Sequence, residues 1–257
     1  MLVASKNAFI YRDVFKRVTH GFWSGVSCEA LKGRGAQKAL VLHLRTTKIV
    51  MNLENKTITA VLAAYSFVPN SGQCDQIRAY ITLLLRWNQK ISLTTVISPV
   101  EILKFHLGES LYAISSVPVQ KGRLADVGSG AGFPGLALAL AVPRLSVSLI
   151  ESNAKKAAFL SEVVRELVLD RVQVLHDRME NLKLHSSAPD LVTARAVGRH
   201  DDLLEWASAN LAPGGKVAMW VGEEELARVS SSRRFAWQDP ALIPGTQARF
   251  ILTGCRR

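Results

Sequence analysis

Residues 124–135 read LADVGSGAGFPG, and this stretch decides the fold. A short apolar run ends in an acid, and five of the eight residues from Gly128 to Gly135 are glycine or proline. Glycine permits positive φ and lets a ligand approach the main chain, and Pro134 suits the first turn of a helix. The stretch therefore predicts a strand, a tight loop and a helix start, and free N–H groups at that start favour an electron-rich ligand.

Strand-like and helix-like patterns alternate downstream of this loop. Helical patterns fill residues 153–167 and 200–211. Apolar strands that alternate with helices predict an α/β fold with a doubly wound, mostly parallel sheet, in which ligands bind beyond the carboxyl ends of the strands. We expect the strands at 123–128, 145–151, 172–176, 190–195, 215–221 and 248–253.

The chain before residue 117 divides into two parts, and we take 117–257 as the main domain. Residues 51–116 predict an N-terminal helical cap, because apolar residues recur at three- and four-residue steps in QIRAYITLLLRWNQKISL and again after Pro99. Residues 1–50 form a basic leader without sustained periodicity, typical of a transit peptide or of an extension upstream of a working start at Met51. The predicted apolar face of the first cap helix consists of Ile77, Tyr80, Ile81, Leu84, Leu85 and Asn88.

The composition is that of a globular protein with unevenly distributed charge. Of its 257 residues 48% are hydrophobic, and the formal net charge is +11. Residues 1–50 hold nine Lys and Arg against two acids, and the remainder holds 23 against 19, so the main part is only mildly basic. This is compatible with a polyanionic partner. No apolar run reaches the roughly 18 residues that cross a bilayer, and we expect a cytoplasmic monomer. The three separated cysteines suggest neither disulfides nor a metal site.

Two acids beside the glycine loop narrow the choice of ligand. Gly130, Gly132 and Gly135 fit the dinucleotide fingerprint GxGxxG, so their spacing alone is compatible with an NAD-binding site. Asp126, however, suits a cationic ligand group and would sit poorly beside a pyrophosphate. Glu151 ends the second strand and can accept hydrogen bonds from both ribose hydroxyls. S-adenosylmethionine has a ribose, an ammonium group and no phosphate, and it fits both acids. The alternative is a turn that merely joins strand and helix.

Four segments resemble one known family. RWNQKISLTTV, DVGSGAGFPG, LIESNAKKAAFLSEV and ARAV, in this order and spacing, resemble the RsmG family, also called GidB, of 16S rRNA guanine-N7 methyltransferases. The resemblance covers about residues 51–253. It implies a Rossmann-like class I methyltransferase domain with a helical cap, S-adenosylmethionine as the methyl donor, and a guanine of 16S rRNA in the small ribosomal subunit as the acceptor.

The resemblance also implies residues for the site. Arg195 would lie beside the cofactor and the target base. His106 resembles a histidine of the family's RH…DS segment, and a packed histidine of the cap is the alternative. For Phe133 and Met179 core packing is an alternative role, and Arg195 can instead form a surface ion pair. Together with the residues discussed above, the expected cofactor contacts are Asp126, Gly128, Gly130, Phe133, Glu151, Met179, Glu180 and Arg195. The candidates for RNA contact are Lys155, Lys156 and Arg199, whose alternative is a solvated surface.

The expected chemistry requires positioning more than proton transfer. N7 of guanine carries a lone pair and no proton, so we expect no catalytic acid or base and no metal, and catalysis rests on alignment and exclusion of water. An arginine is the natural donor to the guanine edge that carries N7 and O6. Arg195 or Arg199 would serve as this positioning residue.

Some polar positions depart from the family pattern. Ser92 replaces an asparagine, Phe105 an arginine, Glu109 an aspartate and Val221 a lysine, and we expect these positions to face RNA. A lost guanidinium can remove a phosphate contact that fixes register on RNA. These departures leave two alternatives open: methylation of another RNA or a small molecule, and an RNA-binding relative without transfer activity. An NAD-dependent oxidoreductase also stays open, from the glycine spacing alone.

Overall fold

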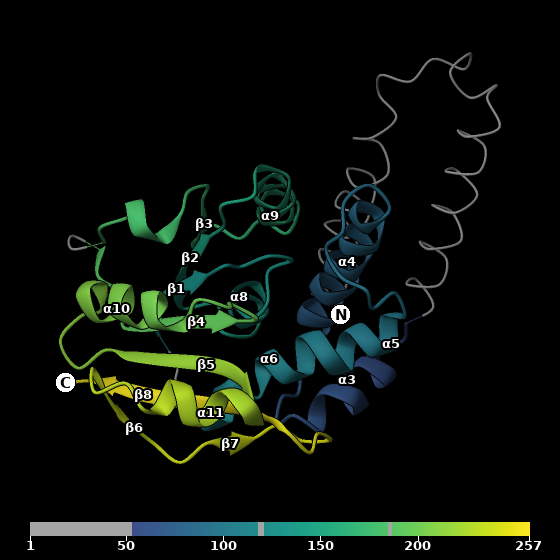
Figure 1. Ribbon diagram of the computed structural model, residues 1–257. Coiled ribbons are helices and arrows are strands. Elements are labelled where there is room, and N and C mark those ends of the chain that lie inside the picture. The colour runs from purple at the N-terminus through teal and green to yellow at the C-terminus, as the bar shows by residue number, and fades with distance from the viewer. Residues whose placement is uncertain (1–52, 118–120, 185–186) are drawn as a thin grey trace.

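The computed structural model describes residues 53–117, 121–184 and 187–257. The predicted basic leader and the working start at Met51 lie outside these ranges. Within them the chain forms a sheet flanked by helices (Figure 1). The strands are β1 (Gly122–Val127), β2 (Leu145–Ile150), β3 (Val172–Leu175), β4 (Leu191–Arg195), β5 (Lys216–Gly222), β6 (Phe235–Trp237), β7 (Ala241–Leu242) and β8 (Arg249–Arg256).

The strand order is that of a doubly wound sheet. It runs β3-β2-β1-β4-β5-β8-β6, with β7 paired to β8. The pairs from β3 to β5 are parallel, and β8 runs antiparallel to β5, β6 and β7. Chain order reverses on either side of β1, so the switch point lies between β1 and β4. The predicted fold class is confirmed; the short strands β6 and β7 were not predicted, since two or three residues show no period.

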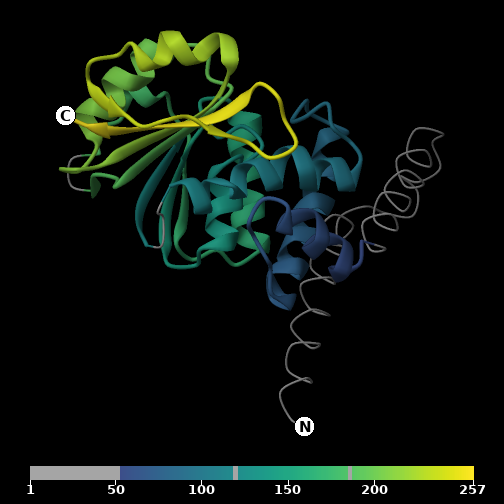
Figure 2. The same cartoon turned by 90° about the horizontal axis from the view of Figure 1, so that it is seen from below.

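Helices cover both faces of the sheet. Successive strand residues point to opposite faces, so Leu124 packs with α8 and α9, whereas its neighbour Ala125 packs with α10. Figure 2 shows these helical layers on opposite sides of the sheet. The helices are α8 (Gly135–Ala141), α9 (Ala154–Glu166), α10 (His200–Asn210) and α11 (Glu223–Ser230).

The helices before β1 share a core with the sheet. The predicted apolar residues of α4 from Ile77 to Leu85 are buried together with α8 and α9. Asn88 is the exception, because its Oδ1 accepts hydrogen bonds from the backbone N of Leu93 (2.8 Å) and Thr94 (3.0 Å) and shapes the following loop. These helices are α3 (Asn55–Ala63), α4 (Ser71–Asn88), α5 (Pro99–Ile102), the π-helical turn η2 (Leu103–Gly108), α6 (Glu109–Leu111) and α7 (Ala113–Ser116).

The segment after Pro99 departs from the single regular helix that its periodicity predicts. A π-helical turn, η2, interrupts it and is continued by α6. Such turns are rare and occur frequently at functional sites. This one carries Phe105 and His106, so it decides where the cap presents these side chains. None of the helices in the described ranges combines the length and apolarity needed to cross a membrane.

Gly135 provides a test of how tightly α8 packs on the sheet. A Cβ added there would lie 2.6 Å from Leu149 Cδ2 and 2.7 Å from Asp126 Cβ, whereas one added at Gly198 would meet nothing within 4 Å. We expect Gly135→Ala to lower the free energy of unfolding by about 1–3 kcal/mol, the usual cost of overpacking. Gly198→Ala, the matched control, should leave it nearly unchanged. Urea denaturation measures both, and equal midpoints would contradict this packing.

Candidate functional site

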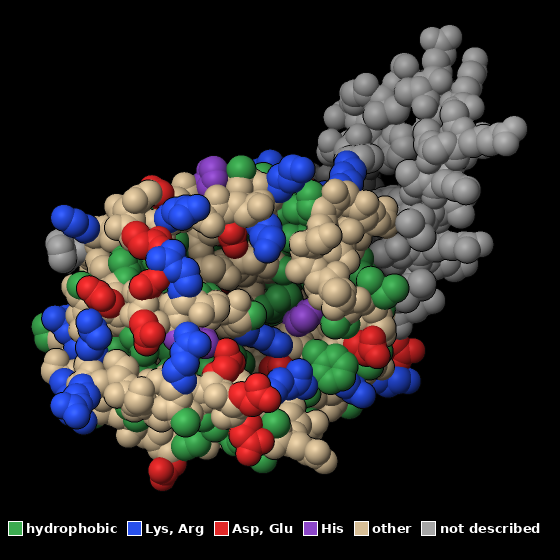
Figure 3. All heavy atoms as spheres, in the orientation of Figure 1, with side chains coloured by type: hydrophobic (Ala, Val, Ile, Leu, Met, Phe, Trp, Pro, Cys, Tyr) green, Lys and Arg blue, Asp and Glu red, His purple; other side chains and the backbone are tan. Residues whose placement is uncertain are grey.

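The predicted site lies at the carboxyl edge of the sheet, beside the switch point. The loop between β1 and α8 turns here, and Gly128, Gly130 and Gly132 have φ of 67°, 56° and 95°. These values lie in the left-handed region, which glycine enters without strain. The backbone N of Gly128 donates to Ile150 O (2.9 Å), so the loop folds across the end of β2. Figure 3 shows that this face of the molecule is hollowed.

Asp126 lies beneath the loop and braces it. Its carboxylate is completely buried; Oδ1 accepts a hydrogen bond from Thr193 Oγ1 (2.7 Å), and Oδ2 accepts one from the backbone N of Gly135 (3.2 Å). It thus connects β1, β4 and the start of α8. This burial argues against the direct contact with a cationic ligand group that we expected, and favours a supporting role. Burial raises the pKa of Asp126 to about 6, against the hydrogen bonds that lower it.

Glu151 holds the loop from the end of β2. Its Oε2 accepts a hydrogen bond from the backbone N of Gly130 (2.8 Å), and its Oε1 accepts one from Asn153 (2.8 Å). Asn153 in turn caps α9, because its side chain accepts from the backbone N of Lys155 and Lys156. Glu151 is therefore where the sequence predicted it, next to the glycine loop. Lys155 is exposed and Lys156 half-buried at the rim of the same region.

The backbone donors of the loop are engaged by acids rather than free. A dinucleotide site offers its loop and helix-start N–H groups to the diphosphate. Here Glu151 accepts from Gly130 N and Asp126 accepts from Gly135 N. The expectation of free N–H groups is therefore wrong for these two, and both carboxylates would repel a phosphate. The arrangement opposes NAD and fits a ligand without phosphate.

Phe133 and Met179 contribute mainly to the cores. The Phe133 ring stacks on His106 with centroids 4.9 Å apart and lies 5.4 Å from Tyr80, so the cap clamps this loop residue. Met179, in the turn η3 (Met179–Asn181) after β3, is buried in the core that also contains Val127. Core packing accounts for most of the surface of both side chains, and their contact with a cofactor stays a prediction.

Glu180 and Arg199 bind each other at the surface. Arg199 Nη1 lies 2.8 Å from Glu180 Oε1, and Nη2 pairs with Asp202. The pair ties η3 to the start of α10. Arg199 thus serves two carboxylates already, which disfavours it as the donor to a guanine edge.

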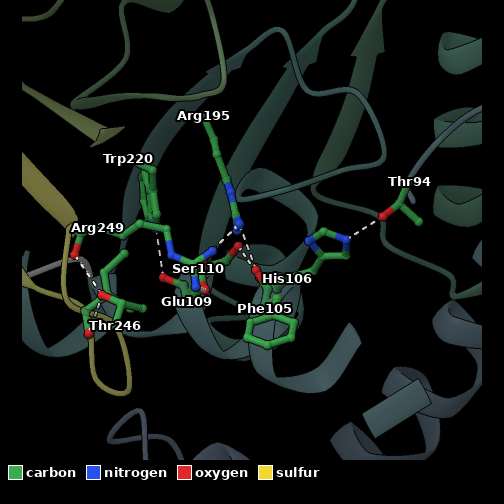
Figure 4. Close-up of polar contacts among 10 residues, drawn as sticks. Thr94, Phe105, His106, Glu109, Ser110, Arg195, Trp220, Thr246 and Arg249 are labelled. Atoms are coloured by element: carbon green, nitrogen blue, oxygen red, sulfur yellow. Dashed lines mark hydrogen bonds and ion pairs between the residues drawn. The ribbon is translucent and has the colours of Figure 1, made fainter. Parts of the chain in front are cut away.

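Arg195 is turned inward, toward the cap. Its Nη2 donates to Phe105 O (2.7 Å) and to Glu109 Oε2 (2.8 Å), as Figure 4 shows. Glu109 is 1% exposed, so this is a buried pair, and the alternative of a surface ion pair is wrong. Burial raises the pKa of Glu109, although Arg195 and Arg249 oppose this. Nη1 of Arg195 is buried and has no hydrogen-bond partner among the described residues.

The backbone beyond Arg195 is strained. Ala196 has φ of 56°, which is uncommon outside glycine. Strain of this kind persists where the surroundings impose it, and it gathers at functional sites. No sequence pattern predicts a positive φ at an alanine.

Several residues of this region escaped the sequence analysis. Arg249 Nη2 lies 2.7 Å from Glu109 Oε1, and Trp220 Nε1 donates to Glu109 O (2.8 Å). Thr94 Oγ1 lies 2.7 Å from His106 Nε2. Burial, with Arg195 nearby, lowers the pKa of His106 to about 4. The only signal for Arg249 in the sequence was its place near the start of the last predicted strand.

The departures from the family pattern lie in different surroundings. Ser92 is exposed and Phe105 half-buried. Val221 is buried in the core between the sheet and the helices α10 and α11, so the expectation that this position faces RNA is wrong. Glu109, also expected to face RNA, is buried and binds arginines instead.

Comparison with known proteins places these features in one family. The GidB family, described as rRNA small subunit methyltransferase G, matches residues 73–239. A ribosomal RNA small subunit methyltransferase G of Halorhodospira halophila is 42% identical over 187 residues, which is 71% of this chain and 87% of that protein. One of Methylibium petroleiphilum is 37% identical over 192 residues, with 72% and 86% covered. The fold is also that of a SAM dependent methyltransferase from Aquifex aeolicus, at TM-score 0.50 and 16% identity over 58% of this chain and 89% of that one.

The buried carboxyl of Asp126 predicts a pH dependence of stability. Because its pKa rises from 3.8 to about 6 on folding, protonation stabilises the folded state. This contribution is fully present below about pH 4 and is lost as the pH rises through about 6. Asp126→Asn removes the titration, so its free energy of unfolding minus that of the wild type should increase by about 3 kcal/mol over this range. Denaturant titrations from pH 4 to 7 measure this, and a constant difference would contradict it.

Proposed function

The chain belongs to the rRNA small subunit methyltransferase G family, and from this premise we propose that it transfers a methyl group from S-adenosylmethionine to N7 of a guanine in 16S rRNA. One observation of the site carries the proposal. Glu151 engages the backbone N of Gly130 in the glycine loop, and Asp126 engages that of Gly135 at the start of α8; this opposes a phosphate and leaves Glu151 beside the loop as an acceptor for a ribose.

The residues around the loop fit this cofactor. When bound, it supplies an electrophilic methyl group on a sulfonium. Each Glu151 carboxylate oxygen accepts one backbone N–H, from Gly130 or Asn153, and keeps a lone pair that can accept a hydrogen bond from a ribose hydroxyl. Gly128 and Gly130 allow close approach to the backbone, and Phe133 and Met179 give apolar contact. Asp126 keeps the loop in position from below, and Glu180 holds the adjoining turn through Arg199.

Arg195 is the positioning residue for the base. Its buried Nη1 donates a hydrogen bond to O6 of the guanine and leaves the N7 lone pair free to attack. The contacts of its Nη2 with Phe105 and Glu109 fix the guanidinium. No general base takes part, since N7 loses no proton. The helices α3 to α7 act as a cap that excludes water from the site on the domain that follows.

The RNA approaches along the rim. Lys155 and Lys156, at the start of α9, lie beside Glu151 and supply positive charge there. Arg199 contributes less, because Glu180 and Asp202 already engage it. The enzyme acts in the cytoplasm as a monomer on 16S rRNA, either free or in the small subunit.

Methyl transfer from labelled S-adenosylmethionine to small ribosomal subunits tests the function directly. The subunits come from a strain that lacks the enzyme of this family, and the modified base is then mapped. We expect a single N7-methylguanine in 16S rRNA, because the N7 lone pair can attack the methyl group of the cofactor without a general base. A methyl group on another RNA alone would show a changed substrate. Cofactor binding without any transfer would show an RNA-binding relative instead.

Arg195→Ala tests the positioning role. We expect methyl transfer to fall by about 100-fold or more, as on loss of an oriented donor in other enzymes. Because the substitution also leaves Glu109 buried with less compensation, Arg195→Lys is measured alongside. It keeps the charge but loses the fork of donors. Cofactor affinity and thermal unfolding are followed for both variants. Near-normal turnover in a folded Arg195→Ala protein would refute the role.

A further inference from the structure

Arg249 lies on the edge of the sheet that carries the site. It begins β8 and pairs with Gly222, the last residue of β5. Because β5 runs parallel to β4, this end of β5 lies on the same edge as Arg195. Ligands of doubly wound sheets bind beyond this edge. Arg249 thus reaches the site from a strand that contributes nothing else to it in the described residues.

The Arg249 guanidinium is held from two sides. Its Nη2 lies 2.7 Å from Glu109 Oε1, and its Cζ lies 5.6 Å from the centroid of the Phe105 ring, within the range of a cation–π contact. Figure 4 shows this group beside Arg195. Glu109 is buried, but 46% of the Arg249 side chain is exposed. The guanidinium is therefore held by Glu109 and Phe105, while almost half of the side chain stays exposed to solvent.

The charges of this cluster do not balance. Glu109 carries one carboxylate, which Arg195 already engages at 2.8 Å, and Arg249 adds a second guanidinium. A guanidinium offers five N–H donors, and the ion pair with Glu109 uses only one of the terminal nitrogens. The remaining fork matches the geometry of a phosphate, which arginine binds with two parallel hydrogen bonds. An excess positive charge at the rim favours an anionic group on the substrate.

We propose that Arg249 binds a backbone phosphate of the RNA strand that carries the target guanine, and that Glu109 and Phe105 orient its guanidinium for this contact. The assignment rests on the proposed function. Phosphate contacts fix the register of a protein on a nucleic acid. Arg249 is thus a positioning residue for RNA, set beside Arg195 at the base, and Phe105 serves as the platform for its guanidinium.

Binding of in vitro transcribed 16S rRNA at a series of KCl concentrations tests the assignment. The full-length wild type is compared with Arg249→Ala, and with Arg144→Ala as the matched control, because Arg144 is an exposed arginine at the opposite edge of the sheet. We expect Arg249→Ala to raise Kd about tenfold and to reduce the slope of log K against log salt by about 1, as for one lost phosphate contact. Arg144→Ala should change neither.

A rescue separates RNA contact from a structural role. Because Arg249 lies over Phe105, the double variant Phe105→Arg/Arg249→Ala places a guanidinium in the same region and should restore the salt slope. Wild-type slope in Arg249→Ala would overturn the assignment and leave the proposed function intact. A reduced slope without methyl transfer by the wild type would overturn the proposed function alone. Failure of the wild type to bind this RNA would overturn both.

Discussion

The buried carboxylate of Glu109 is the constraint on which the organisation of the site depends. Removing a carboxylate from water costs several kcal/mol, so its position is tenable only where opposite charge meets it. Arg195 comes from β4 and Arg249 from β8, and both converge on this one side chain of α6. Trp220 of β5 adds a hydrogen bond to its backbone oxygen. The cap is therefore held on the sheet by directional contacts as well as by the shared apolar core, and these contacts determine where Phe105 and His106 point.

A second pair of carboxylates determines what the glycine loop accepts. The same glycine spacing serves dinucleotides and S-adenosylmethionine, so spacing alone carries little information. The two kinds of site differ in which groups accept hydrogen bonds from the backbone N–H groups of the loop. Asp126 accepts a hydrogen bond from Gly135 N, and Glu151 accepts one from Gly130 N. The donors that would bind a diphosphate therefore face negative charge instead. Asp126 also accepts a hydrogen bond from Thr193 of β4 and braces the loop from within the sheet, whereas Glu151 lies at the end of β2 beside the loop, and sequence spacing does not separate these two roles.

Much of the fold followed from the sequence, and part of the site did not. Apolar runs and their alternation with helices locate β1 to β5 and β8, because each run has to be buried on both faces. The place of Glu151 also followed, since strand ends gather at one edge. The sequence did not predict that Asp126 points into the core or that Val221 is buried, because side-chain direction at a strand end depends on tertiary packing. Arg249 was missed for a similar reason: it meets Glu109 only through sheet pairing between distant segments.

The site carries acids on the side of the glycine loop and arginines on the side of the cap. This distribution affects the barrier of the proposed reaction, in which positive charge moves from the cofactor to the guanine. In the proposed arrangement the methyl group leaves a sulfonium cation on the side of Glu151, and positive charge arises on guanine, on the side of Arg195. Arginines alone would oppose that charge and raise the barrier. Glu109 offsets them, and His106 adds no charge at neutral pH because burial, with Arg195 nearby, lowers its pKa to about 4. The remaining excess of positive charge is at Arg249, at the rim. In the proposed assignment this charge attracts the RNA backbone.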